Sequence, residues 1–258
     1  RGGVSAETLR RLRSLGYISG ATPGRRAFGP PDDVKTMLPF HNRCMEAKDL
    51  FRAGQAARAE EMLKAVLAER PDIDVAYSNL ATVYKESGRL DEALDALRQG
   101  LARLPANYAI YSTYLNFLVA AGRFDEVVEA AADVPLRVAK EDPEFWNDLG
   151  IARANRGEND LALEAFGRGL ALDPGYASIY VNRATLFLSR FLRTKDAAEG
   201  RKAADDYAKA AAADSKNATA FNGMRIVARL SGAPDGAIRS FEKALELKPG
   251  YQDALYNL

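Results

Sequence analysis

His41 and Cys44 are the first residues of this sequence whose types and spacing could do chemistry. They are the only histidine and the only cysteine among 258 residues. Three positions apart on a helix, they would lie on one face, where both could ligate a metal ion. Two ligands do not make a closed metal site, and a single cysteine excludes an internal disulfide. We therefore expect no metal site, and the sequence indicates no cofactor.

Other catalytic patterns are missing. One histidine excludes the HExxH pattern of zinc proteases, and neither GxxxxGK nor a GxGxxG after a strand occurs. The adjacent carboxylates Asp32–Asp33 and Asp205–Asp206 lie in polar surroundings, where acid–base catalysis is not favoured. We therefore predict that this chain is not itself an enzyme.

The charges nearly cancel, with 36 Lys and Arg against 35 Asp and Glu. This balance does not favour a nucleic-acid partner, because such partners select for a strongly basic surface. No stretch reaches the roughly 20 apolar residues of a membrane-spanning helix. The remaining function class is the binding of a protein or peptide.

Prolines give the chain a period close to 34 residues. Pro71, Pro105, Pro174 and Pro249 each end a similar run: LAERP, LARLP, LALDP and LELKP. Counting back from them predicts a repeat array over 40–258 with these units: 40–73, 74–107, 108–142, 143–176, 177–217, 218–251 and a partial unit 252–258.

The unit 143–176 shows what each repeat requires. Trp146 stands fourth, Gly150 eighth, Gly157 fifteenth, Phe166 twenty-fourth and Pro174 thirty-second. The small eighth residue lets two helices approach closely, and the bulky residues fill the space around that contact. The fifteenth-place glycine suits the left-handed residue that ends a helix. It recurs as Gly54, Gly88, Gly122, Gly157 and Gly232.

These spacings resemble the tetratricopeptide repeat, a helix–turn–helix unit of 34 residues. The resemblance covers the six units. It implies an all-α fold, a right-handed superhelix (α-solenoid) of about six repeats, with the first helix of each repeat lining the concave side.

Two units depart from the pattern. Pro135 lies where the second helix of unit 108–142 is expected, which predicts an early end or a kink there. Unit 177–217 carries seven extra residues, which predict a hairpin with each helix longer by about one turn. The tip of that hairpin is basic, with Arg190, Arg193, Lys195, Arg201 and Lys202.

The resemblance also implies which positions face the groove. In tetratricopeptide repeats these are the second, fifth, sixth, ninth, twelfth and thirteenth of each unit. The candidate peptide-binding residues at such positions are Lys48, Asn79, Thr82, Lys85, Asn116, Asn147, Asn182, Asn222 and Arg229. A row of amides can grip an extended peptide, because an amide both donates and accepts hydrogen bonds. The alternative is that asparagine at these places is a structural feature of the repeat, and the sequence leaves both open.

The segment Thr8 to Gly20, TLRRLRSLGYISG, has no counterpart in the repeats. Together with the following Gly/Pro-rich stretch it resembles the end of bacterial sulfatase-type hydrolases that carry such repeats at their C-terminus. The resemblance implies that 1–20 is the remnant of an upstream domain or an N-terminal helix, and that 21–39 is a linker. It transfers no catalytic residue, because the sulfatase C-x-P-S-R pattern is absent.

Two functions follow as hypotheses. The first is a non-catalytic scaffold that binds a protein or an extended peptide in its groove. The alternative is a regulatory or targeting tail of a sulfatase-like hydrolase. Self-association through the N-terminal segment or the partial last repeat is a further hypothesis. The resemblance implies a bacterial source, and the sequence leaves open whether the compartment is cytoplasmic or periplasmic.

Overall fold

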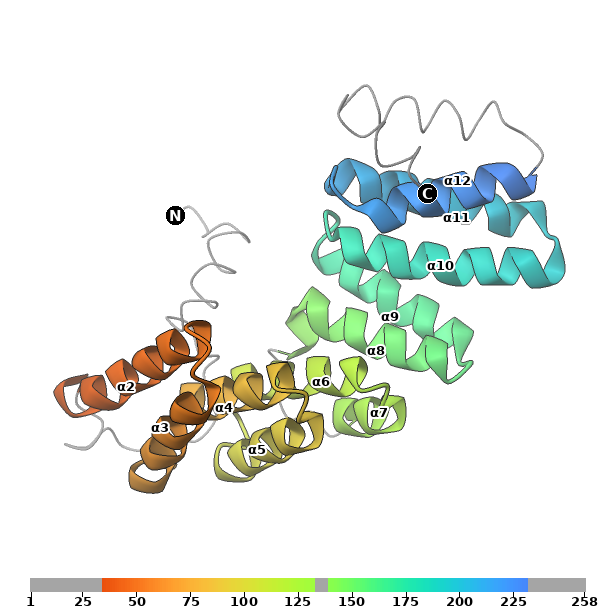
Figure 1. Cartoon of the computed structure of the whole chain (residues 1–258). Helices are drawn as coiled ribbons and strands as arrows, with labels where there is room; N and C mark the ends of the chain where they lie inside the picture. The colour runs from red at the N-terminus through yellow and green to blue at the C-terminus, as the bar shows by residue number, and fades with distance from the viewer. Residues whose placement is uncertain (1–33, 133–138, 232–258) are drawn as a thin grey trace, which may run out of the picture. The chain divides into compact units, whose positions relative to one another are not determined.

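A computed structural model of the chain describes residues 34–132 and 139–231. Within these residues there are eleven α-helices, one short 3-10 helix and no strand (Figure 1). The prediction of an all-α chain built as a helical solenoid is confirmed. The described helices alternate between the first and second helices expected for successive repeats.

The chain divides into two compact units. Unit 1 holds the described residues up to Arg123, together with Ala139, and unit 2 holds Phe124–Ala132 and the described residues from Lys140 onward. The division therefore falls between the two helices of the predicted repeat 108–142. The short 3-10 helix Ala139–Glu141 lies at this division.

Unit 1 consists of two helix hairpins and one further helix. Its helices are α2 (Val34–Arg52), α3 (Ala56–Glu69), α4 (Asp74–Glu86), α5 (Leu90–Arg103) and α6 (Tyr108–Ala120). Each helix packs on the next, and α4 also packs on both α2 and α6 (Figure 1). The first helices of the repeats therefore form a layer of their own in unit 1.

Unit 2 repeats this arrangement. Its helices are α7 (Phe124–Ala132), α8 (Pro143–Asn155), α9 (Asn159–Leu172), α10 (Ala177–Thr194), α11 (Ala197–Ala213) and α12 (Ala218–Ser231). The first helices are again neighbours, because α10 packs on both α8 and α12. α7 packs on α8 and thus covers its outer side within this unit.

The same turn closes successive first helices. Gly54, Gly88, Gly122 and Gly157 all have φ between 69° and 78°, as their sequence position predicted. After α4 the N–H of Arg89 bonds the carbonyl of Tyr84 at 2.9 Å, and the N–H of Gly88 bonds that of Lys85 at 3.0 Å. This pair of bonds satisfies carbonyls that the helix end would otherwise leave unpaired. Gly232 lies outside the described residues.

Glycines inside the helices permit close packing. A Cβ on Gly150 of α8 would lie 2.4 Å from the Phe166 ring of α9. A Cβ on Gly169 would lie 2.5 Å from the Cδ1 of Ile179 and 3.2 Å from the Cβ of Trp146. Gly169 therefore packs against the first helix of its own repeat and of the next. The predicted role of small residues is confirmed here.

The insertion in unit 177–217 lengthens a hairpin, as predicted. α10 has 18 residues and α11 has 17, whereas α8 has 13 and α9 has 14. Lys195 ends α10 in the left-handed conformation, with φ 59°. A lysine thus stands where the other turns use glycine. Asp196 then caps α11 by accepting a hydrogen bond from the N–H of Ala198 at 2.8 Å.

The predicted linker 21–39 is too long by six residues, because α2 begins at Val34 and contains Pro39. A proline disfavours a helix interior, since it lacks an N–H to donate. Tertiary contacts offset that loss: Met37 accepts a hydrogen bond from Arg70, and Leu38 and Ile73 line one shared hollow. Residues 1–33, Pro135 and the predicted units after Ser231 lie outside the described residues.

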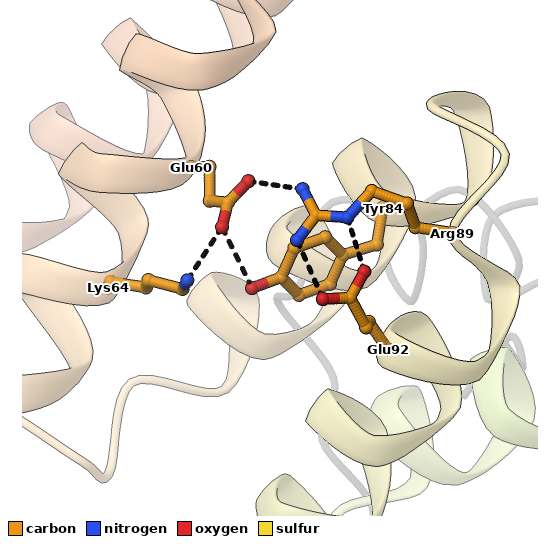
Figure 2. Close-up of polar contacts among 5 residues, drawn as sticks. All are labelled: Glu60, Lys64, Tyr84, Arg89 and Glu92. Carbon is orange, nitrogen blue, oxygen red and sulfur yellow. Dashed lines mark hydrogen bonds and ion pairs between the residues drawn. The ribbon is translucent and has the colours of Figure 1, made fainter.

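A network of charges joins the first two repeats (Figure 2). Glu60 of α3 accepts bonds from Lys64 and from Arg89, each at 2.6 Å, and from the hydroxyl of Tyr84 at 3.2 Å. Arg89 also bonds Glu92 of α5, and its guanidinium lies 4.4 Å from the Tyr84 ring centroid. The hydrogen bonds from Arg89 and Lys64 lower the pKa of Glu60 from 4.5 to about 2. The ionised carboxylate therefore ties α3 to the following hairpin.

We predict that Glu60→Gln lowers the free energy of unfolding by about 1 kcal/mol at neutral pH, as for other partly exposed ion pairs. A carboxylate with a lowered pKa stabilises the fold above its unfolded pKa, and this contribution is lost as the pH falls towards about 2. Denaturant unfolding of both proteins should therefore converge in acid. Glu61→Gln, an exposed neighbour on α3, is the control and should leave stability unchanged. An equal effect of both substitutions would contradict the role of the network.

Gly169→Ala should destabilise the protein by about 1–2 kcal/mol, because the new methyl group overpacks the contact with Ile179. Gly167→Ala, two residues earlier in α9, is the matched control. No atom lies within 4 Å of its Cβ position, so the gain in helix propensity should stabilise by about 0.5–1 kcal/mol. Urea unfolding followed by circular dichroism measures both. Stabilisation by both alanines would show that Gly169 is not a packing residue.

Candidate functional site

The first-helix layer of unit 1 carries a row of exposed polar side chains. Lys48 of α2, Thr82 of α4 and Asn116 of α6 are each 34 residues apart and all exposed. Because α4 packs on α2 and on α6, the row crosses three neighbouring helices. We call these three residues the unit 1 row. It brings together a cation, a hydroxyl and an amide.

Lys85 lies beside the unit 1 row and is half-buried. Its Nζ lies 4.6 Å from the centroid of the Phe117 ring, so the ammonium of α4 rests on an aromatic face of α6. This cation–π contact holds the charge at the surface of the layer. Four of the predicted groove residues thus lie on the first helices of unit 1 with their polar groups at or near the surface.

The amides predicted to grip a peptide are partly used by the protein itself. The side-chain N–H of Asn79 donates to the backbone carbonyl of Cys44 in the preceding repeat at 3.3 Å. In unit 2 the Nδ2 of Asn182 donates to the Oδ1 of the buried Asn147 at 2.8 Å. In both cases the sixth residue of one repeat bonds the fifth residue of the repeat before it. These three amides therefore tie neighbouring repeats together.

The last two predicted groove residues lie on α12. Asn222 is exposed, and its Oδ1 accepts a hydrogen bond from Arg225 at 2.9 Å within the same helix. Arg229 is exposed one further turn and more along α12. The four asparagines predicted as one amide row, Asn79, Asn147, Asn182 and Asn222, thus differ in burial and in bonding.

His41 and Cys44 do not form a ligand pair. Cys44 is fully buried, and burial raises the pKa of its thiol to about 11, whereas His41 is exposed and lines a hollow of about 330 Å³ with Leu38 and Val75. In residues 34–132 and 139–231, no three side chains of His, Cys, Asp or Glu gather closely enough to hold a metal ion. A buried thiol of raised pKa is a poor ligand and a poor nucleophile.

A larger hollow of about 610 Å³ lies between α3 and α5, on the side of unit 1 formed by second helices. Tyr77, Leu80 and Tyr84 of α4 line it together with charged side chains that include Lys64 and Arg103. Lys64 and Glu92 in this lining already belong to the network of Figure 2. The hollow is therefore bounded by groups that stabilise the repeat junction.

Unit 2 contains a buried ion pair that the sequence did not reveal. Asp206 of α11 is only 3% exposed and accepts two hydrogen bonds from Arg183 of α10, at 2.6 and 2.8 Å. The fork of the guanidinium matches the carboxylate, which offsets the cost of burying both charges. The extended hairpin is thus joined through its interior as well as through its apolar contacts.

A second buried carboxyl in unit 2 lacks such a partner. Asp148 of α8 is 4% exposed, and no group among the described residues forms a hydrogen bond or an ion pair with its side chain. Burial, followed by the charges of Glu144 and Asp142, raises its pKa to about 7. Sequence analysis placed Asp148 at a groove position but gave it no role. The acids Glu144 and Asp148, one helical turn apart, were the available signal.

Comparison with known proteins identifies the repeats. Residues 50–103 and 85–147 match the tetratricopeptide repeat family. No curated protein sequence matches the chain. The chain therefore contains tetratricopeptide repeats, and the sequence prediction of that repeat is confirmed.

Solved structures of similar fold agree. pilF of Pseudomonas aeruginosa is 20% identical, with a TM-score of 0.63 over 85% of this chain and 97% of that chain. The protein TTC0263 of Thermus thermophilus is 22% identical over 74% and 97%, with a TM-score of 0.54. YrrB, described as having an unusual peptide-binding site, is 21% identical over 75% and 94%, with a TM-score of 0.53. At these identities the likeness shows the fold alone.

The helices of the described residues include none with both the length and the apolar character needed to cross a bilayer.

Asn182→Ala should lower the free energy of unfolding by about 1–2 kcal/mol, because it leaves the buried Oδ1 of Asn147 without its donor. Asn222→Ala, the matched control on exposed surface, should change it by less than about 0.5 kcal/mol. Chemical denaturation of the two variants and the parent provides the measurement. If the two losses were equal, the bond between Asn182 and Asn147 would not be a tie between repeats.

Proposed function

We propose that this chain is a non-catalytic scaffold that binds an extended peptide segment of a partner protein across its first-helix layer. The observation that carries the proposal is the unit 1 row. Lys48, Thr82 and Asn116 recur at one position of successive repeats, are exposed, and lie on helices that pack side by side.

The chemistry of the row suits a peptide in extended conformation. The amide of Asn116 can donate to and accept from a peptide backbone, and Lys48 can pair with an acidic side chain or a carboxylate. The hydroxyl of Thr82 already bonds the carbonyl of Ser78 at 2.8 Å, so it offers its remaining acceptor capacity. The amide contacts move in this proposal from the four predicted asparagines to Asn116, since the others are engaged within the protein.

The similar folds lend support of a general kind. YrrB carries a peptide-binding site by its description, and pilF and YrrB share the helical arrangement seen here. Helical repeat arrays present long continuous surfaces, which suits the binding of extended partners. The proposal for this chain still depends on its own exposed row.

The alternative parentage, a tail of a sulfatase-type hydrolase, stays a prediction. Its evidence is the segment Thr8 to Gly20, which lies outside the described residues. Sequencing the native gene upstream of Arg1 would test it. A C-x-P-S-R or S-x-P-S-R segment with metal-binding aspartates would support that parentage, and their absence would exclude it. Peptide binding by the repeats is compatible with either result.

The test begins with peptides selected against the full chain from a random displayed library, and the strongest is made with a fluorescent label. The triple variant Lys48→Ala, Thr82→Ala, Asn116→Ala should weaken its binding at least tenfold, or about 1.4 kcal/mol, in fluorescence anisotropy. Because all three side chains are exposed, the melting temperature should not change.

The matched control is Gln99→Ala with Arg103→Ala, which removes an amide and a cation from the second-helix hollow. It should leave the affinity unchanged. Loss of binding in the control but not in the row variant would place the site in the hollow and overturn the proposal. Selection that enriches no peptide would reject peptide binding itself.

A further inference from the structure

The unpaired Asp148 is unusual within this protein because its other buried carboxylates are neutralised. Asp206 has the two bonds of Arg183, and Glu60 has Arg89 and Lys64. Asp148 is as buried as Asp206, yet the charged groups that act on it, Glu144 and Asp142, are both acids. A buried carboxyl surrounded by like charges is costly, and proteins retain such a group where an external partner compensates it.

Neighbouring side chains form a cluster with Asp148. Glu144 precedes it by one turn on α8, so both carboxyls lie on one face of the helix. Tyr176 precedes α10 and is half-buried, and its pKa is raised to about 12 by burial and by the charges of Glu144, Asp142 and Asp148. We call Asp142, Glu144, Asp148 and Tyr176 the acidic cluster. It combines carboxylates with an aromatic ring within unit 2.

The cluster is open to a ligand on one side. Glu144 and Tyr176 are half-buried, whereas Asp148 is almost fully enclosed. Glu144 also has a raised pKa, caused by burial and then by Asp142, and its side chain has no bonded cation among the described residues. Asp142 caps α8 by accepting a bond from the N–H of Glu144 at 2.9 Å. The acceptors of Glu144 and Asp148 are therefore available to a donor that enters from solvent.

We propose that the acidic cluster binds the guanidinium of an arginine side chain in the peptide partner. The inference rests on the proposed function and adds the chemistry of one partner side chain. A planar guanidinium can donate to both carboxylates and stack on the Tyr176 ring. The protein uses this same chemistry internally, where Arg183 bonds Asp206 and lies 5.6 Å from the Tyr180 ring centroid. A metal ion fits less well, because no triad of suitable ligands gathers in the described parts of the chain.

The test uses the full chain with two peptides, acetyl-Gly-Gly-Arg-Gly-Gly-amide and the same peptide with citrulline, the neutral isostere of arginine. Trp146, the only tryptophan, is two residues from Asp148 and Glu144, and its indole N–H gives one NMR signal for the titration. At pH about 8 the arginine peptide should bind at least tenfold more tightly, as expected for a charge-assisted contact. At pH about 5.5 this preference should shrink, because Asp148 takes up a proton while arginine stays charged.

Asp148→Asn should abolish the preference, and Asp205→Asn, an exposed acid on α11 with the same change in charge, should retain it. Equal binding of the two peptides, no binding of either at millimolar concentration, or a preference that survives Asp148→Asn would overturn the proposal. A lower melting temperature of Asp148→Asn would reveal an internal partner and overturn it as well. These outcomes concern unit 2, so the unit 1 row variant separately decides whether the chain binds peptides.

Discussion

The packing of one helix hairpin on the next is the constraint on which this structure depends. A single hairpin cannot bury both of its apolar faces, so each repeat is stable only against a neighbour. Gly150 and Gly169 allow the helices of one repeat to come close and leave room for Ile179 of the next. This packing places the first helices of each unit side by side. The exposed row across α2, α4 and α6 is a consequence of that order.

Polar groups at the repeat junctions show how the array manages burial. Asn79 and Asn182 bond the repeat before them, and Glu60 joins α3 to the following hairpin. A buried polar group costs free energy unless it is paired, so each of these contacts fixes the junction as well as satisfying it. Asp148 differs, since burial raises its pKa and no described residue pairs with it. Such an exception distinguishes a site that can bind from a junction that only supports the fold.

Much of the local structure was predictable from residue spacing. The glycines at 54, 88, 122 and 157 fix turns because a left-handed φ is costly for other residues, and seven extra residues lengthened α10 and α11. The start of α2 was not predictable, because contacts of Met37 and Leu38 outweigh the effect of Pro39. Lys195 likewise adopts the left-handed conformation without a glycine to announce it.

The sequence by itself determined the repeat, its helix pairs and the positions that form the first-helix surface, because these depend on local periodicity. Only the tertiary structure decided which of those side chains are free to bind. Asn147 and Asn116 look alike in sequence, yet one is buried against Asn182 and the other is exposed. Arg183 and Asp206 became a pair, and Asp148 was left alone, because burial and partners depend on helices that are distant in sequence.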